Sequence, residues 1–154
     1  MGLVMSFTRV TPEELERAVA DPVWAGKLMD FLGALDSPDQ PDGYLDKSWD
    51  GLQYLLDKAG VSVGLQEDGI PINEDNTFAG WRADAVKRAS ELLKATPFED
   101  LAGYFDPTEM TEREVYPSFW DADDLEYLRG SYETLVEFFK VTAASKSGAI
   151  RSFG

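Results

Sequence analysis

The segment ADDLEYLRGSYETLVEFFKVTAAS, residues 122–145, carries the clearest secondary-structure signal in this chain. Its apolar residues recur at intervals of three and four, which is the spacing of a buried face on an α-helix. That face comprises Leu125, Leu128, Tyr132, Leu135, Val136, Phe139 and Ala143. The segment SGAIRSF, residues 147–153, follows directly and is typical of a β-strand. The C-terminal part therefore predicts a long helix that leads into a strand.

The N-terminal part predicts a second strand followed by a capped helix. Residues 3–10 form a short apolar run that is rich in strand-forming side chains. Thr11 suits the N-cap of the next helix, because a proline follows it and Glu14 completes a capping box. A Thr or Asp followed by Pro recurs at Thr96 and Asp106, and we expect helix caps there too.

The middle of the chain predicts further helices. Apolar spacing indicates a helix over 23–35, whose buried side is expected to include Phe31 and Leu35. Another helix is expected from Lys47 onward, and Asp46 could cap it.

Strands at both ends with helices between them predict an α+β fold. We expect a small mixed sheet that includes the N- and C-terminal strands and packs against several helices. The length of 154 residues is typical of one domain, so residues 1–154 are expected to form a single domain.

Two residue types that are common in active sites are missing. The chain has no His and no Cys, which excludes disulfides, thiol nucleophiles and a catalytic His. An enzyme with this composition would depend on carboxylates, Lys, Tyr or a bound metal. The acidic run from Asp121 to Glu126 lacks the pattern of a calcium-binding loop and suits the start of a helix instead. We therefore expect no metal site and no cofactor.

The formal net charge is −15, from 29 acidic and 14 basic residues. Such a charge repels nucleic acids and anionic membrane surfaces, so neither is an expected partner, whereas a basic protein would be attracted. The loop 36–43 contributes Asp36, Asp39 and Asp42 to the expected acidic surface. The first residues lack a basic start and a signal-like apolar run, and we expect a cytoplasmic protein that is a monomer or a small homo-oligomer.

The block LDKSWDGLQYLL, residues 45–56, resembles the bacterial YfbM-like family, a domain of unknown function. The opening MGLVM, residues 1–5, and the pair Tyr116-Pro117 after a Glu-rich turn agree with this resemblance. The resemblance covers nearly the whole chain and implies a mixed α/β fold, but it implies no activity. Related sequences tend to place His where this chain has Gln53, which can replace a hydrogen-bonding His but not a catalytic one.

The same block supplies the candidate catalytic and binding residues. Asp46, Lys47 and Asp50 bring two carboxylates and an amine together, and burial that separated their pKa values would allow acid–base chemistry. Trp49 and Gln53 share a helix face and are candidate binding residues. In the structural interpretation, Asp46 caps the helix, Lys47 pairs with Asp50, and Trp49 belongs to the core.

Tyr116 and Trp120 are further candidates for a ligand pocket, although aromatic residues beside a proline are commonly core residues. Taken together, the sequence favours a non-enzymatic binding or interaction protein, with an acidic face for a basic partner as in immunity-type proteins. The alternative is a carboxylate-dependent enzyme that acts on a small substrate through the region from Asp46 to Asp50.

Overall fold

The two strands expected at the chain ends are neighbours at the centre of one sheet. The structure is a computed structural model that describes residues 2–35 and 37–154. β1 (Met5–Val10) pairs antiparallel with β5 (Gly148–Phe153). Among the described residues the strand order is β2-β1-β5-β4-β3. The expected α+β fold is confirmed, and the sheet is antiparallel rather than mixed, because all neighbouring strands run in opposite directions.

The other elements surround this pair of strands. The remaining strands are β2 (Tyr44–Asp46), β3 (Ile70–Pro71) and β4 (Phe78–Trp81). The helices are α1 (Pro12–Ala20), α2 (Pro22–Ala34), α3 (Trp49–Lys58), α4 (Ala83–Lys94), α5 (Phe98–Ala102), α6 (Pro107–Glu112) and α7 (Asp124–Ala144). Within the described ranges, no helix is long and apolar enough to cross a membrane.

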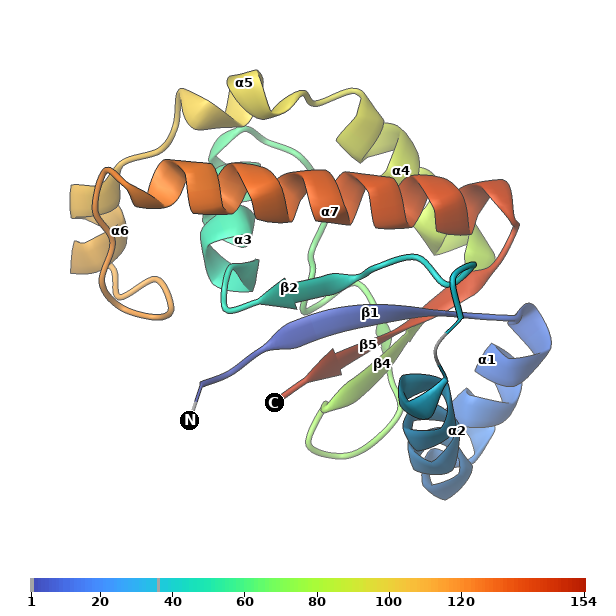
Figure 1. Cartoon of the computed structure of the whole chain (residues 1–154). Coiled ribbons are helices and arrows are strands. Elements are labelled where there is room, and N and C mark those ends of the chain that lie inside the picture. The colour runs from blue at the N-terminus through green and yellow to red at the C-terminus, as the bar shows by residue number, and fades with distance from the viewer. Residues whose placement is uncertain (1, 36) are drawn as a thin grey trace.

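The larger core lies between the sheet and α7, the long helix expected from the sequence. Figure 1 shows α7 lying along one side of the strands, with α4 beside it. Phe7 from β1, Trp81 from β4 and Phe139 from α7 meet edge to face, with ring centroids 5.2 Å to 5.5 Å apart. This geometry is favourable for aromatic rings and joins the two layers.

A smaller core lies on the opposite face, where α1 packs against the sheet. Thr11 caps α1 as expected: its hydroxyl accepts the Glu14 N–H at 3.1 Å, and the Glu14 carboxylate accepts the Thr11 N–H at 2.9 Å. A Cβ at Gly80 or Gly148 would lie 2.8 Å or 2.7 Å from a methyl carbon of Leu15. The two glycines therefore allow α1 to approach the strands closely.

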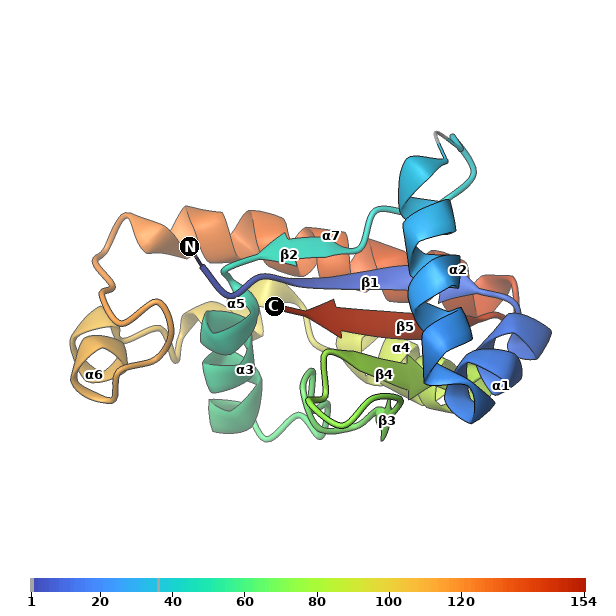
Figure 2. The ribbon, with the colours of Figure 1, turned by 90° about the horizontal axis from the view of Figure 1, so that it is seen from below.

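α2 covers this second face only in part. Figure 2 shows α2 crossing one end of the strands and leaving their other end uncovered. Within α2, Ala25 and Leu28 are buried, but Phe31 is 61% exposed and Leu35, which follows the helix, is 49% exposed. The expected burial of Phe31 and Leu35 is wrong, because only one side of α2 faces the sheet.

Candidate functional site

The block at residues 45–56 begins in a strand and continues as a helix. Asp46 ends β2 with a φ of 54°, and α3 begins only at Trp49. Ser48 is the N-cap residue, but its hydroxyl donates to the Leu45 carbonyl at 2.6 Å and no side chain caps α3. The expectation that Asp46 caps this helix is wrong, because the left-handed turn at Asp46 directs its carboxylate elsewhere.

Two tyrosines hold the Asp46 carboxylate, and we call Tyr44, Asp46 and Tyr127 the tyrosine–aspartate cluster. The Tyr44 hydroxyl donates to Asp46 Oδ1 at 3.3 Å, and the Tyr127 hydroxyl of α7 donates to Asp46 Oδ2 at 3.0 Å. Partial burial and then the nearby carboxylate raise the pKa of Tyr127 to about 12 and raise the pKa of Tyr44 as well. Both hydroxyls therefore stay protonated at neutral pH and act as donors.

Lys47 and Asp50 face other parts of the molecule. The Lys47 side chain is exposed and lies against Gly2. The Asp50 carboxylate accepts the backbone N–H of Tyr116 at 2.8 Å. Asp46, Lys47 and Asp50 thus have different neighbours, and the structure does not gather them into one site.

Trp49, Tyr116 and Trp120 are engaged in packing and in hydrogen bonds to the backbone. Trp49 Nε1 donates to the Leu3 carbonyl at 3.0 Å, and its ring stacks on Tyr116 with centroids 5.6 Å apart. The Tyr116 hydroxyl accepts the Leu3 N–H at 2.6 Å. Trp120 is 5% exposed and its Nε1 donates to the Val115 carbonyl at 2.8 Å. These contacts fix Leu3 and the segment before α7 against α3.

Gln53 holds the segment after α3. Its side-chain oxygen accepts the Leu65 N–H at 2.8 Å, and its amide nitrogen donates to the Val63 carbonyl at 2.9 Å. The amide nitrogen also lies 2.9 Å from an Asp57 carboxylate oxygen. Gln53 therefore uses both amide N–H donors and its oxygen in hydrogen bonds within its own chain, which is a structural role.

Asp50 and Gln53 also line a cleft of about 460 Å³ between α3, the segment that follows it and α4. Its charged lining residues are Asp50, Asp57, Glu67, Asp68 and Arg88. Nowhere in the described residues do three or more acidic side chains gather closely enough to hold a metal ion.

A second acidic hollow, which we call the α7 groove, lies between α7 and residues 38–42. It has a volume of about 520 Å³, and its acidic lining residues are Asp39, Asp42, Glu133 and Glu137. Gly130 and Thr134 line it between these residues. The lining residues that the structure describes include no Lys or Arg. The sequence predicts an acidic loop here, and Asp36 of that loop lies outside the described residues. Nothing in the sequence indicates that the loop faces α7.

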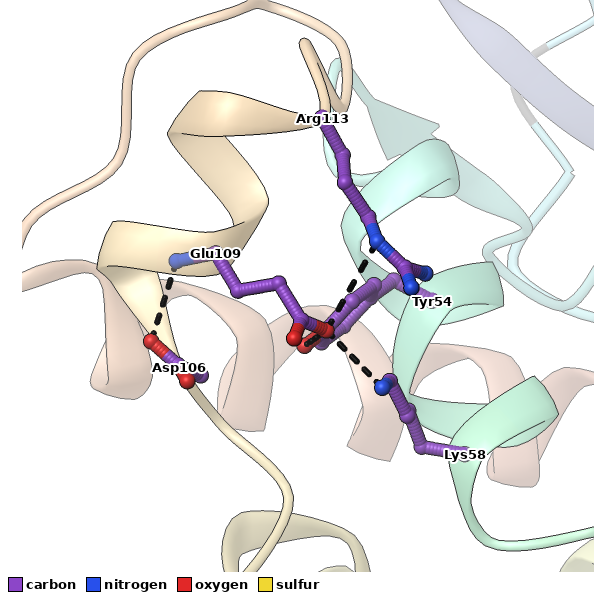
Figure 3. Close-up of polar contacts among 5 residues, drawn as sticks. All are labelled: Tyr54, Lys58, Asp106, Glu109 and Arg113. Carbon is purple, nitrogen blue, oxygen red and sulfur yellow. Dashed lines mark hydrogen bonds and ion pairs between the residues drawn. The ribbon is translucent and has the colours of Figure 1, made fainter.

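The clearest ion-pair network lies between α3 and α6 and was not expected from the sequence. Figure 3 shows Tyr54, Lys58 and Arg113 converging on the Glu109 carboxylate. The Glu109 carboxylate accepts the Tyr54 hydroxyl at 2.6 Å and lies 2.8 Å from Lys58 Nζ and 3.8 Å from Arg113 Nε. Lys58 and then Tyr54 lower the pKa of Glu109, while burial and then Glu109 raise the pKa of Tyr54 to about 12. The network attaches α6 to α3.

Comparison with known proteins identifies relatives but no activity. A family model described as "Domain of unknown function (DUF1877)" matches residues 1–151. Among solved structures, the chain is similar to "a Protein of Unknown Function YfbM from Escherichia coli", with a TM-score of 0.70 and 17% sequence identity over 98% of this chain and 99% of that chain. A likeness at this identity shows the fold alone. No curated protein matches the chain.

Proposed function

We propose that this chain, which belongs to the DUF1877 family, is a binding protein whose α7 groove holds a basic segment of another protein. The family is the YfbM-like one that the sequence resembles. Because it is described only as a domain of unknown function, the proposal rests on the surface of the chain itself.

One observation carries the proposal: four acidic residues line the two walls of the α7 groove, with no basic residue among its described lining residues. Asp39 and Asp42 lie on one wall, and Glu133 and Glu137 lie on the other. Basic residues lie in its surroundings: Lys140 Nζ is 4.0 Å from Glu137, and Arg9 donates to the Asp39 carbonyl. Lys94, Arg129 and Lys140 line a neighbouring hollow that Glu133 and Glu137 also border. A concave surface of one charge sign concentrates counter-charged ligands and steers their approach.

The alternative enzyme hypothesis has less support from the geometry. Asp46 accepts hydrogen bonds from tyrosines of β2 and α7, whereas Asp50 accepts one from the Tyr116 backbone and lines the other cleft. Acid–base catalysis by the two carboxylates needs both of them to face the same bound substrate. Their different surroundings favour recognition over catalysis.

A titration with hexa-lysine tests the proposal. We expect the wild-type chain to bind this peptide more weakly at about 300 mM than at about 50 mM salt, because exposed charge pairs are screened. The double variant Glu133→Gln/Glu137→Gln should weaken binding about five-fold, since it removes two exposed carboxylates from the groove. Dissociation constants from isothermal titration calorimetry provide the measurement.

The control variant is Glu13→Gln/Glu91→Gln. It changes the net charge by the same amount at exposed positions of α1 and α4, outside the groove. Its dissociation constant should stay within about two-fold of the wild-type value, as expected for a general charge effect alone. Equal weakening by both double variants, or no salt-sensitive binding at all, would contradict the proposal.

A further inference from the structure

We infer that the tyrosine–aspartate cluster is the anchor of this surface and that it binds an arginine side chain of the partner. The inference rests on the proposed function, because it assumes that a basic segment lies in the α7 groove. It also specifies which side chain of the basic segment the surface selects.

The Asp46 carboxylate is held in place before any ligand arrives. Each of its oxygens accepts one hydrogen bond, Oδ1 from Tyr44 at 3.3 Å and Oδ2 from Tyr127 at 3.0 Å. A carboxylate offers about four acceptor positions, so each oxygen keeps capacity for another donor. Asp46 is half-buried rather than buried.

The backbone at Asp46 is also unusual. A φ of 54° is uncommon for a residue other than Gly, although Asp tolerates it better than most. Ser6 lies opposite Tyr44 while Met5 lies opposite Asp46, so Leu45 is an extra residue in β2. Such bulges bend a strand and redirect its side chains, and they are frequent at sheet edges beside functional sites. Leu45 is 1% exposed, while the residues on either side of it turn outward.

The two tyrosine rings provide the second half of the anchor. Tyr44 is 55% exposed and Tyr127 is 39% exposed, although both are large aromatic residues. In the part of the chain that the structure describes, no Lys or Arg forms an ion pair with Asp46, and the adjacent Lys47 lies against Gly2 instead. Exposed aromatic rings beside a carboxylate attract a cation through both charge and ring faces.

The cluster is continuous with the α7 groove. The Asp42 carboxylate, which lines the groove, accepts the Tyr44 N–H at 2.9 Å. Tyr127 lies about one helical turn before Gly130, another lining residue of the groove. A basic segment in the groove would therefore extend to Asp46.

Arginine suits this site better than lysine. A guanidinium is a planar fork that can donate one N–H to each oxygen of a carboxylate, which matches one remaining acceptor position on each Asp46 oxygen. It also stacks on aromatic faces, whereas an ammonium is a compact and strongly hydrated charge. The site therefore predicts discrimination between two peptides of equal charge.

Titration of the full chain with hexa-arginine and with hexa-lysine tests this discrimination. The wild-type chain should bind hexa-arginine about five-fold more tightly, as one stacked and forked guanidinium contact would give. Asp46→Asn should reduce this preference to within about two-fold, because an amide offers one acceptor oxygen where the carboxylate offers two. Asn tolerates the positive φ at this position, so the variant should fold. Tyr44→Phe/Tyr127→Phe, which removes both donors and keeps both rings, should reduce the preference in part.

Two controls separate the anchor from the groove. Asp30→Asn removes a carboxylate from an exposed position of α2 and should keep the preference. Glu133→Gln/Glu137→Gln should weaken the binding of both peptides and leave the preference for hexa-arginine over hexa-lysine unchanged. If neither peptide binds the wild-type chain, the proposed function is wrong and the anchor with it. Equal binding of both peptides, or a preference that survives in Asp46→Asn, overturns the anchor alone.

Discussion

Glu109 illustrates how much of this structure depends on single side chains that meet from distant positions in the sequence. Its carboxylate joins Tyr54 and Lys58 of α3 to α6, and Asp106 caps the same short helix by accepting the Glu109 N–H at 3.0 Å. Tyr54 is 8% exposed, so its hydroxyl needs a partner inside the protein. Glu109 provides that partner only while the two helices are in contact.

The lowered pKa of Glu109 predicts a loss of stability in acid. A carboxyl group whose pKa is lower in the folded than in the unfolded state contributes stability above its unfolded pKa. That contribution disappears as the pH falls through the folded pKa, which for Glu109 lies below its ordinary value of 4.5. Urea unfolding at about pH 6 and about pH 3 should therefore show a smaller decrease in unfolding free energy for Glu109→Gln than for the wild-type chain.

Glu112→Gln is the matched control for this measurement. Glu112 is exposed, lies in the same helix, and has no ion pair within the described residues. This variant should lose as much stability between the two pH values as the wild-type chain does. If Glu109→Gln also loses as much as the wild-type chain, the network does not contribute to acid sensitivity.

Patterns in the sequence single out individual side chains but do not reveal which distant side chains contact them. Asp46 and Gln53 were singled out from the block at 45–56, but the Asp46 partner Tyr127 lies 81 residues away. The Tyr54 and Glu109 side chains are likewise 55 residues apart and belong to no motif. Local spacing indicates what a residue can do chemically, whereas its partner is set by the packing of whole helices.

Among the elements, local capping signals succeeded where no neighbouring helix competed for the same side chain. Thr11 caps α1 as expected, because β1 ends just before it and leaves its hydroxyl free. Thr96 follows α4 almost directly, and its hydroxyl donates back to the Leu92 carbonyl at 2.8 Å. The expected cap at Thr96 is therefore wrong, and Pro97 is the N-cap residue of α5. The helices α1, α2, α3 and α7 and the two terminal strands follow from local patterns in the sequence, but the short β2 and its bulge do not.

The contact between α1 and the sheet predicts that Gly148→Ala is destabilising. The new methyl group would lie 2.7 Å from a Leu15 methyl carbon and 2.9 Å from the Trp81 carbonyl oxygen. Because a backbone atom is involved, relief requires movement of a strand, and overpacking of this kind costs about 1–3 kcal/mol. Gly103→Ala is the control, since a Cβ there has no atom within 4 Å. Thermal unfolding should show a lower midpoint for Gly148→Ala only, and similar midpoints for both variants would contradict this account.

For the whole molecule, the excess of negative charge bears on stability as well as on the proposed binding of a basic segment. The chain carries 29 acidic and 14 basic residues. Its ion pairs lie at positions where solvent reaches the side chains, as for Arg82 and Glu16 at 49% and 57% exposure. Exposed pairs of this kind contribute little, so mutual repulsion among the remaining carboxylates opposes the compact state. A basic partner would relieve that repulsion when it binds.

Salt should therefore stabilise the free protein. Added chloride salt screens exposed charges over about 10 Å at 0.1 M, which weakens repulsion between distant carboxylates more than attraction within close pairs. The midpoint of thermal unfolding should rise between about 20 mM and about 500 mM NaCl, and KCl should have the same effect because screening depends on ionic strength.

Saturating hexa-lysine at low salt should also raise the midpoint of thermal unfolding, because a ligand that binds only the folded state stabilises it by mass action. This rise should be smaller in Glu133→Gln/Glu137→Gln than in Glu13→Gln/Glu91→Gln, although both have the same net charge. A midpoint that falls with added salt would show that the ion pairs outweigh the repulsion.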